Sequence, residues 1–166
     1  MSIMSILPAT VLALCAVATV VAQDSKKETK HLTVATSASP ETVAPGKRLS
    51  LAVDVAPKPK MHVYSPGQAG YIGITLTLEE NPGFTAAKAK YPAGEKTYMP
   101  LLKETQLVYA KPFRIAQDVV VRPTGGAAAL AVLTIKGTLR YQACDETICY
   151  LPTTVPLVWT VKLGSK

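Results

Sequence analysis

The sequence lacks most of the patterns that mark an enzyme with a helical scaffold or a bound cofactor. Beyond the N-terminal segment, no part of the 166-residue chain shows the 3.6-residue periodicity of an amphipathic helix. It contains no glycine-rich phosphate loop, no Cys-x-x-Cys-His haem motif and no order of Ser, His and Asp that indicates hydrolysis. We therefore predict that the protein binds no cofactor.

Concentrated positive charge is also missing, although the chain is basic. Its 18 Lys and Arg residues outnumber 11 Asp and Glu residues, which gives a net charge of +7. These basic residues are scattered, without a dense run and without interleaved aromatic side chains. Nucleic-acid-binding domains gather such charge on one face or in one run. We therefore predict no nucleic-acid partner.

The chain has a single long apolar run, residues 6–22, which is uncharged and ends in small residues. This pattern is typical of a signal peptide cleaved after Ala22. We predict a signal peptide over 1–22, a flexible polar leader over 23–30 and one domain over 31–166. No Lys or Arg precedes the apolar run, so a retained membrane anchor is the alternative.

Cysteine is scarce, and its distribution favours an oxidising compartment. The chain has three cysteines, and signal cleavage would remove Cys15. The remaining Cys144 and Cys149 form an even pair, which in an exported chain implies a possible disulfide.

Period-two alternation of apolar and polar residues dominates the rest of the chain. It is clearest over 49–55, 72–79 and 155–162, with shorter strand patterns between Pro- and Gly-rich turns. We expect a bend or bulge at Gly137 and an edge position or bulge at Pro156. Short strands spaced in this way predict an all-β sandwich.

Residues 92–103 break the strand pattern and are predicted to form a loop. This segment contains the large apolar side chains of Tyr98, Met99, Leu101 and Leu102. A loop with four such residues is expected to pack over another part of the molecule.

Cys144 and Cys149 are separated by Asp-Glu-Thr-Ile and lie between two strand patterns. Their spacing allows a disulfide across a hairpin, worth roughly 2 kcal/mol for a loop of about six residues. The spacing alone leaves open whether the bridge is a structural staple or a reversible redox centre. Asp145 and Glu146 disfavour a thiolate, so the pair is better suited to be attacked as a disulfide than to attack.

The residues around the cysteines resemble the active-site hairpin of a known family. Residues 141–144 are Tyr-Gln-Ala-Cys, and residues 149–152 are Cys-Tyr-Leu-Pro. With His-Val-Tyr-Ser at 62–65 and Tyr-Pro at 91–92, the chain resembles the N-terminal periplasmic domain of the thiol:disulfide interchange protein DsbD. The resemblance extends over roughly residues 32–163.

This resemblance implies a periplasmic domain with an immunoglobulin-like β-sandwich fold. It implies that the domain accepts electrons from a thioredoxin-like protein or domain and passes them to periplasmic disulfide oxidoreductases and isomerases. Cys149 would form the mixed disulfide and Cys144 would resolve it. A separate membrane electron-transfer protein is expected upstream, because the membrane and C-terminal domains of the larger family proteins are not in this sequence.

The resemblance also implies a cap loop over the disulfide. The cap and site-lining residues would be Tyr98, Met99, Leu101, Leu102, Tyr64 and Tyr141. The tip departs from the family pattern of an aromatic and acidic residues, since residues 99–102 are Met-Pro-Leu-Leu.

Two other interpretations follow from the residues. The first is an immunoglobulin-like binding or scaffold module whose hairpin disulfide is purely structural. The second is a copper site built from His31, His62, Met61 and Met99, but the spacing of these residues is poor and we predict no metal.

Overall fold

The computed structural model describes residues 25–123 and 132–164, and these residues form strands without a helix. No helix able to cross a membrane occurs in that part of the chain. The strands are β1 (Ser25–Glu28), β2 (Leu32–Ser39), β3 (Thr42–Val43), β4 (Arg48–Pro57), β5 (His62–Tyr64), β6 (Thr75–Leu78), β7 (Phe84–Ala86), β8 (Glu95–Met99), β9 (Glu104–Tyr109), β10 (Phe113–Val121), β11 (Val132–Tyr141), β12 (Ala143–Cys144) and β13 (Thr153–Leu163). The predicted signal peptide, 1–22, lies outside the described residues.

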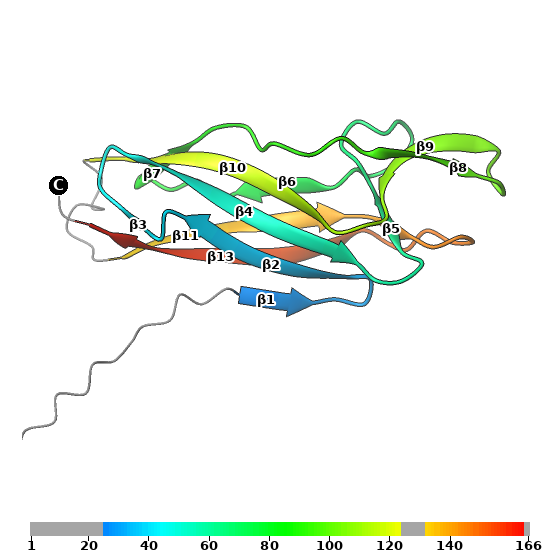
Figure 1. The fold of residues 1–166 in the computed structure, drawn as a ribbon, viewed down its shortest axis with the longest axis horizontal. Coiled ribbons are helices and arrows are strands. Elements are labelled where there is room, and N and C mark those ends of the chain that lie inside the picture. The colour runs from blue at the N-terminus through cyan, green and yellow to red at the C-terminus, as the bar shows by residue number, and fades with distance from the viewer. Residues whose placement is uncertain (1–24, 124–131, 165–166) are drawn as a thin grey trace, which may run out of the picture.

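Two sheets pack face to face and enclose the main core (Figure 1). The first sheet has the strand order β1-β2-β4-β10-β7, and the second has the order β3-β13-β11-β6. This architecture confirms the predicted all-β sandwich.

The alternating sequence pattern explains how each sheet contributes to the core. Along β4 and β13, alternate side chains are buried and the intervening ones are partly or fully exposed. Trp159 of β13 crosses the interface and donates from Nε1 to the carbonyl oxygen of Ala52 on β4, at 3.1 Å. The indole therefore buries its ring without leaving its N–H unpaired.

A third, smaller sheet lies at one end of the sandwich, the right-hand end in Figure 1. Its strand order is β12-β5-β9-β8. The β8–β9 hairpin and the loop between β12 and β13 both project at this end. The third sheet thus brings the predicted cap segment and the cysteine pair to the same end of the molecule.

The predicted flexible leader is wrong for residues 25–28, which form β1. This strand pairs antiparallel with β2, from Ser25↔Thr36 to Glu28↔Thr33. Lys27 donates from Nζ to the carbonyl oxygen of Pro156 at 2.6 Å. An edge strand held by backbone pairing needs no buried face of its own, so its polar sequence gave no strand signal.

The predicted loop over 92–103 is wrong for residues 95–99. Residues 95–99 form β8, which pairs with β9 from Glu95↔Val108 to Met99↔Glu104. Because β8 is the last strand of the third sheet, its mixed polar sequence reflects an edge position.

Pro156 does lie at an open edge. The partner of β13 on its outer side, β3, pairs only with Lys162 and Leu163. The missing N–H of Pro156 therefore costs no sheet hydrogen bond on that side.

Gly137 shows no bulge, in contrast to the sequence-based expectation. The register runs without interruption through Gly137↔Leu157 on one side and Gly137↔Leu78 on the other. A Cβ atom at this position would lie 2.7 Å from the carbonyl oxygen of Thr77 and 3.3 Å from the Trp159 ring. Close approach of neighbouring atoms, and not a kink, requires glycine here.

Gly137→Ala should therefore lower the free energy of unfolding by roughly 1–3 kcal/mol, because the added methyl group must displace a strand backbone or the tryptophan. Denaturant unfolding would measure the loss. Thr134→Ala, on the exposed side of the same strand, is the control and should cost under about 1 kcal/mol. Equal effects of the two substitutions would contradict the packing argument.

Candidate functional site

The cysteine hairpin joins the two most extensively paired strands of the second sheet. The β11–β13 ladder ends at Tyr141↔Thr153, so residues 142–152 must turn at the end of the sandwich. Within this turn β12 pairs with β5, and Cys144 lies opposite His62. Cys149 comes back beside Cys144 as an antiparallel bridge, and the two sulfurs form a disulfide with an S–S distance of 2.04 Å.

The two sulfurs belong to residues with very different exposure. Cys144 is 1% exposed, whereas Cys149 lies in the exposed part of the loop. Cys149 lines a groove of about 800 Å³ between the cysteine hairpin and the β8–β9 hairpin. Cys149 is therefore the more accessible of the two cysteines.

One face of the third sheet forms the floor of this groove. Tyr64 of β5 pairs with Val108 of β9, and Cys144 of β12 is opposite His62. Tyr64, Val108 and Cys144 pack into a small cluster separate from the main core. The disulfide therefore has a packing environment of its own.

The hydroxyl of Tyr64 contacts both sulfurs, at 3.3 Å from Cys144 Sγ and 3.4 Å from Cys149 Sγ. A disulfide sulfur carries no proton, so the phenol must be the donor in both contacts. Burial raises the pKa of Tyr64 to about 12, with the neighbouring Tyr71 adding to the rise. The phenol therefore keeps its proton at any physiological pH.

Three further side chains fix the surroundings of Tyr64. The ring of Tyr71 stacks on that of Tyr64, with centroids 4.2 Å apart. The Tyr71 hydroxyl donates to Glu104 Oε1, and Gln106 Nε2 donates to the same oxygen at 2.6 Å. The hydrogen bond from Tyr71, then that from Gln106, lowers the pKa of Glu104, so this carboxylate is charged at neutral pH.

Asp145 organises the loop between the cysteines. Its Oδ1 accepts hydrogen bonds from the backbone N–H groups of Thr147 and Ile148, at 2.8 and 2.9 Å, and from the Thr147 hydroxyl. Its Oδ2 accepts from the hydroxyl of Tyr150 at 2.9 Å. The backbone N–H of Ile148 leads the donors that hold the pKa of Asp145 far below its usual range.

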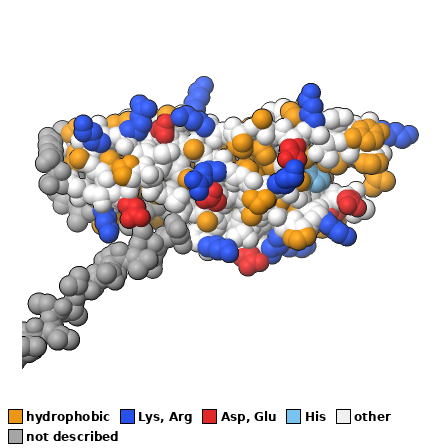
Figure 2. Space-filling view, viewed as in Figure 1, with side chains coloured by type: hydrophobic (Ala, Val, Ile, Leu, Met, Phe, Trp, Pro, Cys, Tyr) orange, Lys and Arg blue, Asp and Glu red, His pale blue; other side chains and the backbone are white. Residues whose placement is uncertain are grey.

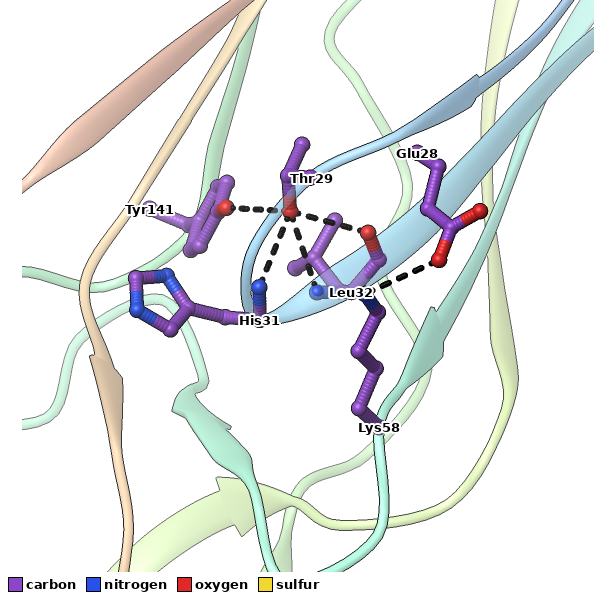
Figure 3. A network of polar contacts seen from close by, with 6 residues as sticks. All are labelled: Glu28, Thr29, His31, Leu32, Lys58 and Tyr141. Carbon is purple, nitrogen blue, oxygen red and sulfur yellow. Dashed lines mark hydrogen bonds and ion pairs between the residues drawn. The ribbon is translucent and has the colours of Figure 1, made fainter.

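Aromatic residues support the side of the cysteine loop that faces β2. The His31 ring packs on that of Tyr150 with centroids 4.4 Å apart, and Lys30 Nζ lies 4.8 Å from the Tyr150 centroid. Thr29 Oγ1 contacts the Tyr141 hydroxyl at 2.9 Å and also bonds the backbone of His31 and Leu32 (Figure 3). This network fastens the start of β2 to the end of β11.

The predicted cap residues lie beside the groove, which remains open. Tyr98, Met99, Leu101 and Leu102 all line it. Met99 packs against the cluster of Tyr64, Val108 and Cys144, while Tyr98, Leu101 and Leu102 are 59%, 70% and 54% exposed. Figure 2 shows hydrophobic side chains gathered at this end of the molecule.

The structure brings most of the sequence-predicted site residues together, with one exception. Cys149, Tyr64 and the four cap residues line the groove, and Cys144 is buried beneath it, bonded to Cys149 and in contact with Tyr64. Tyr141 instead lies fully buried in the main core, and its hydroxyl faces Thr29. Tyr141 therefore supports the hairpin from the core side and is not among the side chains that line the groove.

The sequence-based reasoning missed Glu104 and Gln106 and assigned no role to Tyr71. A signal for two of them exists in the alternation of Glu104, Gln106 and Val108 along β9: Gln106 lines the groove, and Val108 packs with Tyr64 and Cys144. No pattern singles out Tyr71, which comes from the irregular segment between β5 and β6. No group of three or more His, Cys, Asp or Glu residues suited to a metal ion occurs within residues 25–123 and 132–164.

The fold and the site define a class of protein: a small β-sandwich domain with a solvent-accessible disulfide at one end. Comparison with known families then identifies the group. The family described as "Thiol:disulfide interchange protein DsbD, N-terminal" matches residues 29–157. The chain belongs to this family. Membership and the Cys144–Cys149 disulfide together support thiol-disulfide exchange as the general class of function.

Among solved structures, the chain is similar to the N-terminal periplasmic domain of ScsB from Proteus mirabilis, with a TM-score of 0.56 and 10% sequence identity. The alignment covers 84% of this chain and 50% of that one, so the chain spans half the length of the ScsB domain structure. This similarity agrees with the predicted immunoglobulin-like sandwich. The yeast GGA1 GAE domain aligns over 82% of this chain and 98% of its own, with a TM-score of 0.47 and 11% identity. No curated protein sequence matches the chain.

Asp145→Ala should shift the equilibrium between disulfide and dithiol about tenfold toward the dithiol, because the loop that holds the sulfurs together loses its organising acceptor. Titration with oxidised and reduced dithiothreitol would measure the shift. Glu146→Ala, at the neighbouring exposed acid, is the matched control and should leave the equilibrium nearly unchanged. A similar shift in both variants would show that charge, and not loop organisation, matters.

Acidification should destabilise the protein through its buried histidines. His31 is 7% exposed, and neither ring nitrogen has a hydrogen-bond partner among the described residues. Burial lowers the pKa of His31, and burial also lowers that of His62. The two histidines therefore bind protons more readily in the unfolded chain than in the folded one. Above the unfolded pKa of about 6.5 they cost no stability, and the free energy of unfolding falls as the pH drops below that value.

The pH dependence of denaturant unfolding between pH 7.5 and pH 5 would test this expectation. His31→Phe should flatten the decline, and the double variant with His62→Phe should flatten it further. An unchanged slope in the double variant would assign the acid sensitivity to other groups.

Proposed function

We propose that this domain relays electrons in the periplasm by reversible exchange of the Cys144–Cys149 disulfide with thioredoxin-like partners. It receives electrons from a thioredoxin-like donor and passes them to exported disulfide oxidoreductases or isomerases. The observation that carries the proposal is the asymmetry of the pair, with Cys149 exposed in a groove and Cys144 buried beneath it.

The exchange step follows from this asymmetry. A partner thiolate attacks Cys149 Sγ and forms a new S–S bond, while the Cys144–Cys149 bond breaks and its electron pair leaves on Cys144 Sγ. The second cysteine thiolate of the same partner then attacks the partner sulfur in the mixed disulfide and releases Cys149 as a thiolate. The partner dithiol has become a disulfide, and the domain has gained two electrons. The reverse sequence reduces the next partner.

The surroundings of Cys149 support a protein partner. Ile148 and Leu151 flank it and are 54% and 86% exposed, and Leu101 and Leu102 face it from the cap. Exposed apolar side chains gathered around a reactive group are typical of a protein-docking site. The periplasmic location is supported by the apolar segment over residues 6–22 and by the similarity to a periplasmic domain of ScsB.

The alternative is a binding or scaffold module with a purely structural bridge. A staple would contribute most where it closes a long loop, but Cys144 and Cys149 are separated by five positions. The bridge also lies outside the main core, which already joins the two large sheets. These features favour an exchange function over a structural one.

Two single-cysteine variants test the proposal, each in a Cys15→Ser background. The probe is a thioredoxin whose nucleophilic cysteine carries thionitrobenzoate and whose second cysteine is serine. Cys144→Ala, which keeps the exposed Cys149, should release thionitrobenzoate and form a mixed disulfide at least tenfold faster than Cys149→Ala. Absorbance at 412 nm and a non-reducing gel would follow the reaction.

If neither variant forms a mixed disulfide, the relay proposal fails. A reduction potential below about −300 mV for the native pair would favour the structural bridge instead.

A further inference from the structure

We propose that Glu104 positions the hydroxyl of Tyr64 for the exchange reaction, acting through Tyr71. The hydroxyl then donates a hydrogen bond to the sulfur of Cys144 as that sulfur leaves. This inference rests on the proposed exchange function, and it assigns a role to residues outside the cysteine motif.

The first step of the argument is the place of the Tyr64 hydroxyl. It lies within 3.4 Å of both sulfurs and can act only as the donor toward them. Cys144, at 1% exposure, is nearly inaccessible to water. When the disulfide opens, the thiolate on Cys144 therefore depends on protein donors, and Tyr64 is already in contact with it.

The second step is what holds the Tyr64 ring. Tyr71 stacks on it with an interplanar angle of 24°, and Tyr71 belongs to a segment without strand pairing. The hydroxyl of Tyr71 donates to Glu104, which is the first residue of β9. Glu104 pairs with Met99 of β8, and β9 pairs further along with β5 at Val108 and Tyr109, so the carboxylate belongs to a hydrogen-bonded strand.

The third step is what holds Glu104. Gln106, two residues along the same strand and 1% exposed, donates to the Glu104 carboxylate from Nε2. The carboxylate is thus oriented from within its own strand while it accepts from Tyr71. The other charged or titratable side chains that line the groove are Lys60, His62, Tyr98 and Glu146. Of these, His62 packs edge-on to Tyr64 at 5.8 Å, and Asp145, next to the groove, is committed to its own loop.

During exchange the electron pair of the broken S–S bond resides on Cys144 Sγ, and the Tyr64 proton stays on the phenol oxygen as a hydrogen-bond donor. No proton is transferred, and no further reactant is needed. Glu104 and Tyr71 touch neither sulfur, so both are positioning residues.

The test measures the pKa of the Cys144 thiol in Cys149→Ser protein, from the pH dependence of the Cys144 ¹³Cβ chemical shift. Adding Tyr64→Phe should raise this pKa by about one unit, the usual effect of losing a hydrogen bond to a charged group. Adding Glu104→Ala should also raise it, because Tyr71 loses its anchor and Tyr64 loses its fixed position.

The sign of the Glu104→Ala effect separates positioning from simple electrostatics. Removing a nearby carboxylate would by itself lower the pKa of a thiol. A rise therefore supports positioning, and a fall or no change overturns it. Glu104→Gln, whose carbonyl oxygen still accepts from Tyr71, should not raise the pKa. Glu95→Ala is the matched control, since the exposed Glu95 pairs with Lys111 and should have no effect.

Tyr71→Phe keeps the stacked ring and removes only the hydrogen bond to Glu104. This variant replaces Glu104→Ala in the test if Glu104→Ala fails to fold. It should raise the Cys144 pKa as Glu104→Ala does, and an unchanged value would overturn the proposal. No partner protein takes part in this measurement. Failure of the positioning role would therefore appear here, whereas failure of the exchange function would appear in the mixed-disulfide experiment.

Discussion

The antiparallel pairing of β11 with β13 is the constraint on which the candidate site depends. The register is continuous from Val132↔Lys162 to Tyr141↔Thr153, and it fixes both ends of the cysteine hairpin. Buried side chains on both strands tie this ladder to the main core. The position of the disulfide is therefore determined by core packing some distance away, because the hairpin between those ends is short.

The hairpin is supported on its two sides by different kinds of contact. Toward β2, the ring of His31 packs on Tyr150, and the hydroxyl of Tyr150 reaches Asp145. Toward the groove, Tyr64 contacts the two sulfurs. None of the hydrogen bonds that Asp145 accepts involves a sulfur atom, so opening the disulfide breaks none of them directly.

Burial of Cys144 has a cost that the single tyrosine offsets only in part. A hydrogen bond to a charged group contributes about 1.5–3 kcal/mol, whereas burying an ion costs several kcal/mol. The thiolate that leaves on Cys144 is therefore less stable than one in water. A partner that covers the groove and contributes apolar contacts can compensate for this cost, whereas a small thiol cannot. The geometry thus favours exchange with proteins over exchange with small thiols.

The sequence predicted the sandwich and the cysteine hairpin because each depends on local patterns. Alternation along residues 49–55 and 155–162 reports burial directly, and the spacing of Cys144 and Cys149 limits their geometry. Strands β1 and β8 escaped prediction because edge pairing leaves little trace in composition. The contact of Tyr71 with Tyr64 and Glu104 joins three separate segments, and no local pattern encodes such a contact.

The β8–β9 hairpin combines an apolar tip with a charged residue on its second strand, and the two parts lie in different surroundings. The tip, residues 100–103, is a turn with Lys103 at a positive φ of 54°, and its leucines are largely exposed. The charged group that Tyr71 contacts, Glu104, by contrast belongs to β9 and pairs with Met99 of β8. In the proposed function, tip residues can therefore change with the surface of the partner while Glu104 stays in place. The proposed recognition and positioning roles are separated along a single hairpin, because one depends on exposed side chains and the other on strand register.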